Sequence, residues 1–296
     1  MTAIREVRDG TRPQDPGTIS PISDGMYLNG HQVPRLTGER PTPGATPDSL
    51  IALHAAGYRE VNRRVGQGLV IDMGCGLGFE SIGLADTGRN LIGIDYDPGA
   101  AIQAHHRWSE QGFSAACMDA ACIAIRDSQV DWICSSHLIE HFRKPAMHVA
   151  EVSRVLKSDG TAFFIAPNAP ADFENPFHVT SFEARSLAGL LGQYFTDVWV
   201  GGLDGTPAVK QDIGSRRLKA NRLLSLDFLR LRHKMPYKWY VGIYTKVLPV
   251  VYRIIARRDS GGSTGITEQD FAVVNEVDSR TLALFAIAKG PRRLES

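Results

Sequence analysis

Short apolar runs alternate with segments of helical periodicity along most of the chain. The runs that end at glycine or polar residues, as buried strands do, are 69–72, 90–95, 130–135 and 161–168. Apolar residues at helical spacing occupy 47–65, 79–88, 99–111 and 147–157. Two later runs, 196–202 and 282–289, predict an antiparallel strand pair that closes the sheet. The alternation predicts an α/β fold, with Asp48 or Ser49 capping the first helix and Asp97 the third.

The first strand runs into a glycine-rich loop. Residues 70–78 read V-I-D-M-G-C-G-L-G, so Asp72 is followed by glycines at positions 74, 76 and 78. Glycine leaves room for a ligand and permits positive φ, and a helix that follows offers unpaired N–H groups. The loop therefore predicts a cofactor cradle.

The spacing of the glycines decides which cofactor the loop suits. A dinucleotide fingerprint needs G-x-G-x-x-G, but Phe79 stands where its third glycine belongs. The loop instead resembles motif I of the class I S-adenosylmethionine (SAM) methyltransferases, and Asp95, 21 residues after Gly74, matches their ribose-binding acidic residue. The resemblance implies a seven-stranded Rossmann-like sheet with helices on both faces, SAM as methyl donor and S-adenosylhomocysteine as product.

The resemblance also implies a set of cofactor contacts. In it, Arg59 reaches the methionine carboxylate, Asp119 accepts from the adenine amino group and Ala120 offers its backbone N–H. Alternatively, Arg59 only solvates an outer helix face, and Asp119 belongs to an ordinary polar turn. The full predicted set is Arg59, Asp72, Gly74, Gly76, Gly78, Asp95, Tyr96, Asp119, Ala120 and Ser135.

Candidate catalytic residues follow the strand at 130–135. The stretch 136–142 reads S-H-L-I-E-H-F, which places His137, Glu140 and His141 on one face of a helical turn. The pattern H-x-x-E-H also occurs in zinc proteases, but a position behind a SAM fingerprint argues against that class. Methyltransferases commonly carry h-x-E-H here, and His137 stands where some ubiquinone-type O-methyltransferases place a metal-binding glutamate.

The loop at 168–182 supplies a further candidate, His178. Its run N-P-F-H-V-T-S-F resembles segments of methyltransferases associated with glycan and cell-surface polysaccharide pathways. The resemblance implies His141 as general base, assisted by His137, Glu140 and His178, and the same four residues as ligands of a divalent cation such as Mg²⁺. Alternatively, Glu140 and His141 fix the loop by bonding to backbone, and His178 is a loop histidine.

The chain divides into four predicted regions. These are a proline-rich N-terminal arm (1–46), the SAM-binding core (47–208), a helical insertion (209–265) and a last segment that completes the sheet (266–296). Residues 210–258 carry 13 basic and two acidic side chains, whereas the rest carries 20 basic and 30 acidic ones. A solvated basic face explains this insertion, and an anionic glycan, a membrane surface or nucleic acid are alternative partners.

Composition narrows the class of protein. Of 296 residues, 43% are hydrophobic and 22% charged, and no apolar run reaches 18 residues, which predicts a soluble cytoplasmic protein without a transmembrane segment. The four cysteines lack C-x-x-C spacing and predict buried thiols. We expect a monomer or homodimer that methylates a sugar hydroxyl, with a phenol, quinone, amine or nucleic acid as alternative acceptor and a non-catalytic SAM-binding module as the remote alternative.

Overall fold

The computed structural model describes residues 27–28, 31–32, 46–172, 177–224 and 265–293. The chain divides into two units, Met1–Arg35 and Leu36–Ser296. In the first, β1 (Tyr27–Leu28) and β2 (His31–Gln32) form an antiparallel pair. The second unit holds all the remaining elements and the candidate site.

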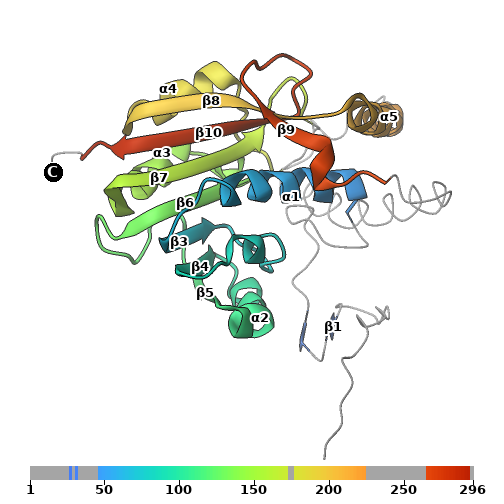
Figure 1. The fold of residues 1–296 in the computed structure, drawn as a ribbon. Helices are drawn as coiled ribbons and strands as arrows, with labels where there is room; N and C mark the ends of the chain where they lie inside the picture. Colours follow the sequence, from blue (N-terminus) through green and yellow to red (C-terminus); the bar gives the residue numbers. More distant parts are fainter. Residues whose placement is uncertain (1–26, 29–30, 33–45, 173–176, 225–264, 294–296) are drawn as a thin grey trace, which may run out of the picture. The chain divides into compact units, whose positions relative to one another are not determined.

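An eight-stranded sheet forms the centre of the second unit (Figure 1). Its order is β5-β4-β3-β6-β7-β10-β8-β9, in which β3 to β7 are parallel and the last three strands pair antiparallel. The strands are β3 (Gly68–Met73), β4 (Arg89–Asp95), β5 (Phe113–Cys117), β6 (Val130–Ser136), β7 (Leu156–Pro167), β8 (Phe195–Gly205), β9 (Phe271–Val274) and β10 (Ala283–Pro291).

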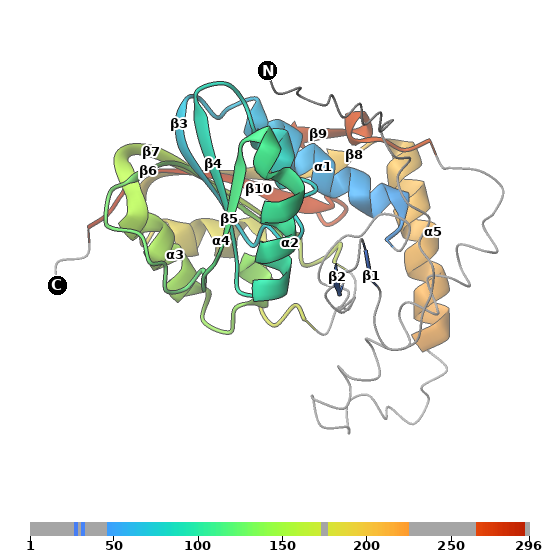
Figure 2. The ribbon, with the colours of Figure 1, turned by 90° about the horizontal axis from the view of Figure 1, so that it is seen from below.

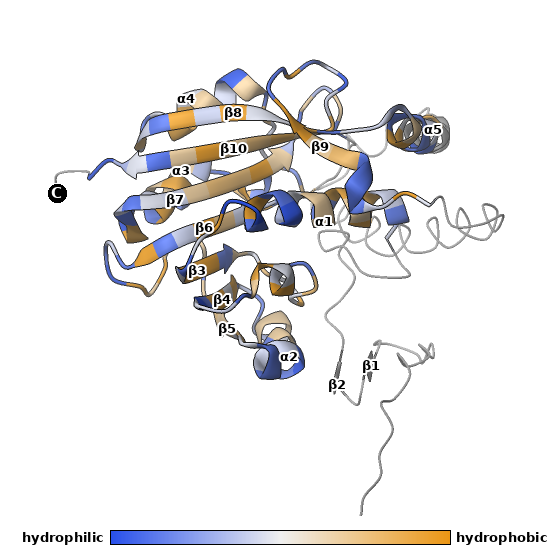
Figure 3. Cartoon of the chain, viewed as in Figure 1, coloured by the Kyte–Doolittle hydropathy of each residue, from blue (hydrophilic) through white to orange (hydrophobic). Residues whose placement is uncertain are grey.

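Helices cover both faces of this sheet, as predicted. They are α1 (Asp48–Asn62), α2 (Pro98–Trp108), α3 (Pro145–Val155), α4 (Ala184–Leu191) and α5 (Pro207–Leu224). Figure 2 shows α1 on the side opposite α3 and α4. Apolar residues of α3 and α4 pack in one core and those of α1 and α2 in another, one on each face. Figure 3 shows β7, between them, as mostly apolar. Most side chains on the central strands are therefore buried whichever face they point to.

The pattern was right about the central strands and the closing pair but missed one strand. β8 and β10 pair antiparallel, as expected, whereas β9 makes the sheet eight-stranded rather than seven-stranded. β9 has only four residues, with burial falling from buried Phe271 to half-buried Val274, so it lacks the alternation that marks a strand. β7 also begins earlier than predicted, because Leu156 pairs with Val130 across an irregularity in the ladder.

Two local predictions near the cofactor loop were wrong in detail. Pro47 is the N-cap of α1, so neither Asp48 nor Ser49 caps it. The helix expected over 79–88 shrinks to the 3-10 turn η1 (Ser81–Leu84), after which Ala85 is extended with ψ 134°. Gly83 lies inside this stretch, and glycine lowers helical stability by about 1 kcal/mol relative to alanine. Asp97, in contrast, caps α2 as predicted, accepting from the Gly99 N–H.

The remaining expectations have mixed outcomes. Cys75 and Cys134 are buried, but Cys117, on the edge strand β5, and Cys122, after that strand, are exposed, so half of the prediction about buried thiols was wrong. In the described ranges, no helix combines the length and apolarity needed to cross a membrane. α5 forms the start of the predicted helical insertion, whereas the helices expected over 225–258 lie outside the described residues.

Candidate active site

The glycine loop after β3 has the backbone that its sequence predicts. Gly74, Gly76 and Gly78 have φ of 76°, 54° and 75°, in the region that favours glycine. A Cβ at Gly74 would lie 2.9 Å from Leu138 Cδ1, and a Cβ at Gly78 would lie 2.8 Å from Trp108 Cδ1. Close packing by the protein thus adds a second reason for glycine, beside room for a ligand.

Asp95 ends β4 directly beside this loop. Its side chain is 5% exposed, and its two oxygens accept from the Gly76 N–H and the Asp97 N–H, each at 2.9 Å. A carboxylate has two oxygens with two lone pairs each, which suits it to accept hydroxyl groups. Tyr96, 66% exposed, follows at the rim. The carboxylate is held by backbone where a diol acceptor is expected.

Asp72, two residues before the first glycine of the loop, connects β3 to α1 and η1 by hydrogen bonds. It is fully buried and accepts from the Tyr58 hydroxyl at 3.1 Å to each oxygen, and from the Ser81 hydroxyl. Burial raises the pKa of Asp72 to about 7, against the opposing hydrogen bonds from Ser81 and Tyr58. Its acceptors are therefore occupied by α1 and η1, which suits a structural support better than a direct cofactor contact.

The segment expected to bind adenine is tied to Asp95. The Met118 N–H donates to the Asp95 carbonyl at 3.0 Å, and the Asp119 side chain accepts from the Ala121 N–H at 2.8 Å. The Ala120 carbonyl accepts from His148 Nδ1 at 2.9 Å. The Asp119–Ala120 pair thus lies at the carboxyl edge with its position fixed from two sides.

His148, on α3, is a residue that the sequence analysis missed. Besides Ala120, it accepts from the Ser135 hydroxyl at 2.9 Å through Nε2, and its ring stacks on Phe142 with centroids 4.9 Å apart. His148 and Ser135 are both fully buried, and burial lowers the pKa of His148 to about 4. The hydroxyl of Ser135 therefore contacts His148. The available signal was the spacing of His148 and Val152 on the buried face of α3.

Arg59 uses all three of its guanidinium nitrogens in hydrogen bonds within the chain. Its guanidinium donates to the Glu268 carbonyl, to the Phe271 carbonyl at 2.7 Å and to Glu60 at 2.9 Å. It thereby fastens the segment before β9 to α1. This placement favours neither of the two sequence-based interpretations, since Arg59 acts here as a structural clamp.

The four predicted catalytic residues do come together. Glu140 lies in the 3-10 turn η3 (Ile139–His141), and its backbone carbonyl accepts from the Val179 and Thr180 N–H groups at 3.0 Å each. These bonds bring the 177–182 segment against η3, so that the His141 and His178 rings are 5.3 Å apart. Residues from two separate loops therefore share one site.

Hydrogen bonds orient both of these histidines. His141 Nδ1 lies 3.0 Å from the Phe177 carbonyl, and His178 Nδ1 lies 2.8 Å from Asp172 Oδ2. A carbonyl oxygen can only accept, so Nδ1 of His141 carries the proton and Nε2 has the lone pair. That nitrogen is the one available for chemistry.

Glu140 is a buried carboxylate that accepts no hydrogen bond from the described residues. It is 2% exposed, and neither oxygen has a hydrogen-bond partner among the described residues, since His137 Nδ1 is 3.6 Å away. Burial by itself would raise the pKa of Glu140, but the nearby His137, His141 and His178 outweigh it and lower that pKa. The ionised carboxylate therefore depends on its histidine neighbours.

His137 and His54 extend the cluster towards α1. Their rings lie with centroids 4.1 Å apart and planes tilted by 31°, and His137 has a φ of 50°, which is uncommon for a residue with a side chain. His137 Nε2 is buried with no hydrogen-bond partner among the described residues, and burial lowers the pKa of His54 well below its ordinary value. Strain and unpaired polar atoms coincide at this point.

A cation-binding geometry exists within the cluster. One ligand atom each of Glu140, His141 and His178 lies within 4.8 Å of the others. His137, the fourth predicted ligand, is outside this group of three.

Comparison with known proteins gives three findings. Residues 71–164 match the family model described as a methyltransferase domain. A probable S-adenosylmethionine-dependent methyltransferase of Mycolicibacterium smegmatis is 32% identical over 53% of this chain and 63% of its own length. One of Mycobacterium tuberculosis is 29% identical over 68% of this chain and 72% of its own length. Neither name specifies an acceptor.

The solved structures agree at the level of the fold. A SAM-dependent methyltransferase of Thermotoga maritima superimposes with a TM-score of 0.53, covering 82% of this chain and 91% of that one, at 12% identity. The likeness shows a shared Rossmann-like architecture.

Proposed function

We propose, from the premise that this chain carries a class I SAM-dependent methyltransferase domain, that it transfers the methyl group of SAM to a hydroxyl of a sugar or oligosaccharide. Asp95 would accept the ribose hydroxyls, the loop at 74–78 would lie along the methionine and ribose portions, and Asp119 with Ala120 would contact adenine. Support comes from their common position at the carboxyl edge of β3, β4 and β5.

The single observation that carries the choice of a hydroxyl is the setting of His141. Because Nδ1 donates to the Phe177 carbonyl, Nε2 can take a proton, and the adjacent Glu140 carboxylate would stabilise the imidazolium that results. The carbon–sulfur bond of SAM breaks as a carbon–oxygen bond forms, the hydroxyl proton passes to Nε2, and S-adenosylhomocysteine leaves. An amine that is already deprotonated needs no such base.

A sugar acceptor is favoured by the polar character of the neighbouring loop. His178 Nδ1 and Asp172 Oδ2 lie 2.8 Å apart at the same edge, with side chains 15% and 22% exposed, so this loop places polar groups beside the cluster. The N-P-F-H-V-T-S-F resemblance points the same way.

A divalent cation is a second version of the same proposal. The Glu140 carboxylate, which accepts no hydrogen bond from the described residues, fits one, and the Nδ1 bonds of His141 and His178 to a carbonyl and a carboxylate resemble those that orient metal-binding histidines. Two imidazoles suit Mn²⁺, Co²⁺ or Zn²⁺ better than Mg²⁺, which prefers oxygen ligands. A cation there would supply Lewis acidity to the acceptor oxygen. His141 would then be a ligand and not the base, so the two versions exclude each other.

Methyl transfer from labelled SAM to a panel of mono- and oligosaccharides, phenols and amines tests the acceptor class. We expect transfer to sugars. Robust transfer only to amines or to nucleic acid would overturn this part of the proposal, and SAM binding without transfer to any acceptor would favour the non-catalytic module. If the basic insertion binds nucleic acid, the measured affinity should fall steeply as the salt concentration rises.

Calorimetric titration of Mn²⁺ separates the two versions of the site. If a cation is part of it, the wild type binds Mn²⁺ and Glu140→Gln does not, and a chelator abolishes turnover. Full turnover in the presence of the chelator leaves His141 as the base.

A further inference from the structure

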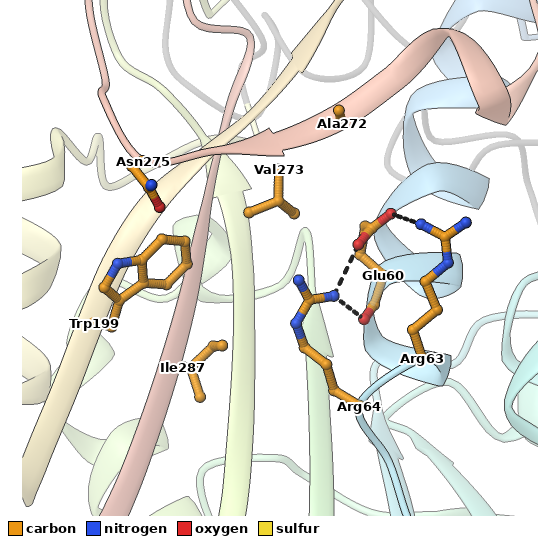
Figure 4. Close-up of a pocket in the computed structure, with 8 residues that line it drawn as sticks. All are labelled: Glu60, Arg63, Arg64, Trp199, Ala272, Val273, Asn275 and Ile287. Carbon is orange, nitrogen blue, oxygen red and sulfur yellow. Dashed lines mark hydrogen bonds and ion pairs between the residues drawn. The ribbon is translucent and has the colours of Figure 1, made fainter.

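A pocket lies apart from the candidate active site, on the sheet face that α1 covers, towards the outer strands. It has a volume of about 450 Å³ and is lined chiefly by Glu60, Arg63, Arg64, Trp199, Val273 and Asn275 (Figure 4). These residues come from α1, the turn after it, β8, β9 and the residue that follows β9. None of them belongs to the site described above.

The register of the sheet separates this pocket from the candidate active site. Trp199 pairs with Ile287, which also lines the pocket, and Ile287 pairs with Phe163 of β7. Phe163 precedes the carboxyl end of β7, Pro167, by about 13 Å of extended strand. A ligand here would therefore occupy the flank of the sheet rather than the edge that holds the cofactor loop.

Positive charge exceeds negative charge at this pocket. The Glu60 carboxylate pairs with Arg59 at 2.9 Å and with Arg63 and Arg64 at 2.8 Å each. Burial would raise the pKa of Glu60, but the hydrogen bonds from Arg64 and Arg59 lower it, so the carboxylate stays ionised. Two of these guanidinium groups, those of Arg63 and Arg64, line the pocket together with this one carboxylate, and none of the other lining residues is acidic. The surplus favours an anion.

Arg64 presents the hydrogen-bonding edge that such an anion needs. Its Nη1 donates to the Glu60 carbonyl at 2.6 Å and to the Glu60 carboxylate at 2.8 Å, and its guanidinium lies 5.4 Å from the centre of the Phe285 ring. Within the described part of the chain, no acceptor contacts Nε or Nη2. These two donors form the fork that binds a carboxylate with two parallel bonds. Figure 4 shows Arg64 between Glu60 and the strand residues.

The remaining walls suit a polar ring. Trp199 is half-buried and offers a flat indole, and exposed Asn275 adds an amide that can donate to and accept from hydroxyls. The pocket is open on one side, whereas sites for free small molecules usually bury most of the ligand. An open pocket accommodates one unit of a longer chain, whose neighbouring units extend into solvent.

We infer that this pocket binds a sugar unit carrying a carboxylate, such as a uronic acid of a glycan chain, with the carboxylate on the Arg64 fork and the ring against Trp199. The choice of a sugar rests on the proposed function, whereas the choice of a carboxylate rests on the arginines alone. The acceptor would then be an acidic glycan that is held at two places.

Titration of glucuronate into the 296-residue protein, followed by calorimetry, tests this inference without any methyl transfer. We expect saturable binding at millimolar concentrations, with roughly tenfold weaker binding of glucose and of the glucuronate methyl ester, which lack the charge. Equal binding of glucose would overturn the role of the carboxylate, and equal binding of inorganic phosphate would overturn the sugar. No saturation by 50 mM glucuronate, a concentration set by millimolar affinity, would overturn the site.

Two variants locate the binding. Arg64→Lys keeps the charge but removes the fork, and we expect it to weaken glucuronate binding roughly tenfold while SAM affinity stays unchanged. Arg280→Lys, at a side chain that is 81% exposed and does not line the pocket, is the matched control and should bind as the wild type does. Unaltered binding by Arg64→Lys would overturn the inference even if the enzyme proves to methylate sugars.

Discussion

Two buried carboxylates at the carboxyl edge of the sheet differ in their hydrogen bonding. Asp95, 5% exposed, accepts from the backbone N–H groups of Gly76 and Asp97, whereas Glu140, 2% exposed, accepts no hydrogen bond from the described residues. A buried charge without partners is costly, so Glu140 must be stabilised by its histidines or by something that binds. The carboxylate proposed to bind the cofactor is thus held by backbone hydrogen bonds, whereas the carboxylate beside the proposed acceptor position is not.

The largest effect is expected for His141→Ala, which tests whether the residues around Glu140 act in turnover and not in SAM binding. We expect turnover to fall by about 10²- to 10⁴-fold, the usual contribution of a general base, while SAM affinity stays at the wild-type value. Methyl transfer and calorimetry on the same preparations measure the two effects. His105→Ala, at an exposed histidine of α2, is the control and should retain both. A parallel fall in SAM affinity would place His141 on the cofactor side.

Asp95→Ala tests the proposed role of the hydrogen-bonded carboxylate in cofactor binding. Loss of a charge-assisted hydrogen-bond pair costs about 2–3 kcal/mol, so SAM affinity should fall roughly 30- to 150-fold. Asp95→Asn keeps one oxygen and should fall less. Wild-type affinity in a folded Asp95→Ala protein would contradict the role of this carboxylate in ribose binding.

The pH dependence of stability sharpens the comparison through His148. Its pKa is about 4 in the folded protein, below the ordinary 6.5, because burial outweighs the opposite effects of the Ala120 carbonyl, Asp119 and Glu140. Below pH 6.5 the unfolded chain takes up a proton that the folded protein does not, so stability falls between pH 6.5 and 4. At pH 5 the loss is about 2 kcal/mol.

Denaturant titrations of the wild type and His148→Gln at pH 7 and pH 5 measure this contribution. The stability advantage of the wild type should shrink at pH 5, since glutamine does not titrate. Asp72, whose pKa is raised to about 7, contributes with the opposite sign in both proteins, because the folded form keeps a proton that the unfolded chain releases. An advantage that is the same at both pH values would mean that His148 is not neutral in the fold.

The smallest expected effect is that of His148→Gln on SAM affinity at pH 7. His148 contacts the Ala120 carbonyl, so loss of this bond should loosen the adenine-side segment and weaken SAM binding by up to about tenfold. An adenosine analogue should lose affinity by the same factor, whereas methionine should not. Equal losses for both fragments would indicate general destabilisation instead.

Local spacing explains what could be foreseen. The positive φ values of the glycine loop, the place of Asp95 and the cap at Asp97 depend on residues within one strand–loop–helix segment, so the sequence predicted them. His141 and His178 also lie close together, as expected of two residues of one site, but that expectation came from the family resemblance.

Contacts between distant segments explain what could not be foreseen. Arg59 bonds to residues 209 and 212 positions away, and His148 reaches back 28 residues to Ala120. Nothing near Arg59 or His148 in the sequence indicates these partners. The exposure of Cys117 likewise depends on β5 being the outermost strand, which the order of strands along the chain does not reveal.

The clamp formed by Arg59 also bears on self-association of the protein. β9 is an edge strand, and unpaired carbonyls on an edge invite a second copy to add its own strand. Arg59 occupies the Phe271 carbonyl at 2.7 Å with a charged group, and the strand ends after four residues. The Arg59 bond and the shortness of β9 therefore hinder lateral extension of the sheet at this edge, whereas β5 forms the other edge.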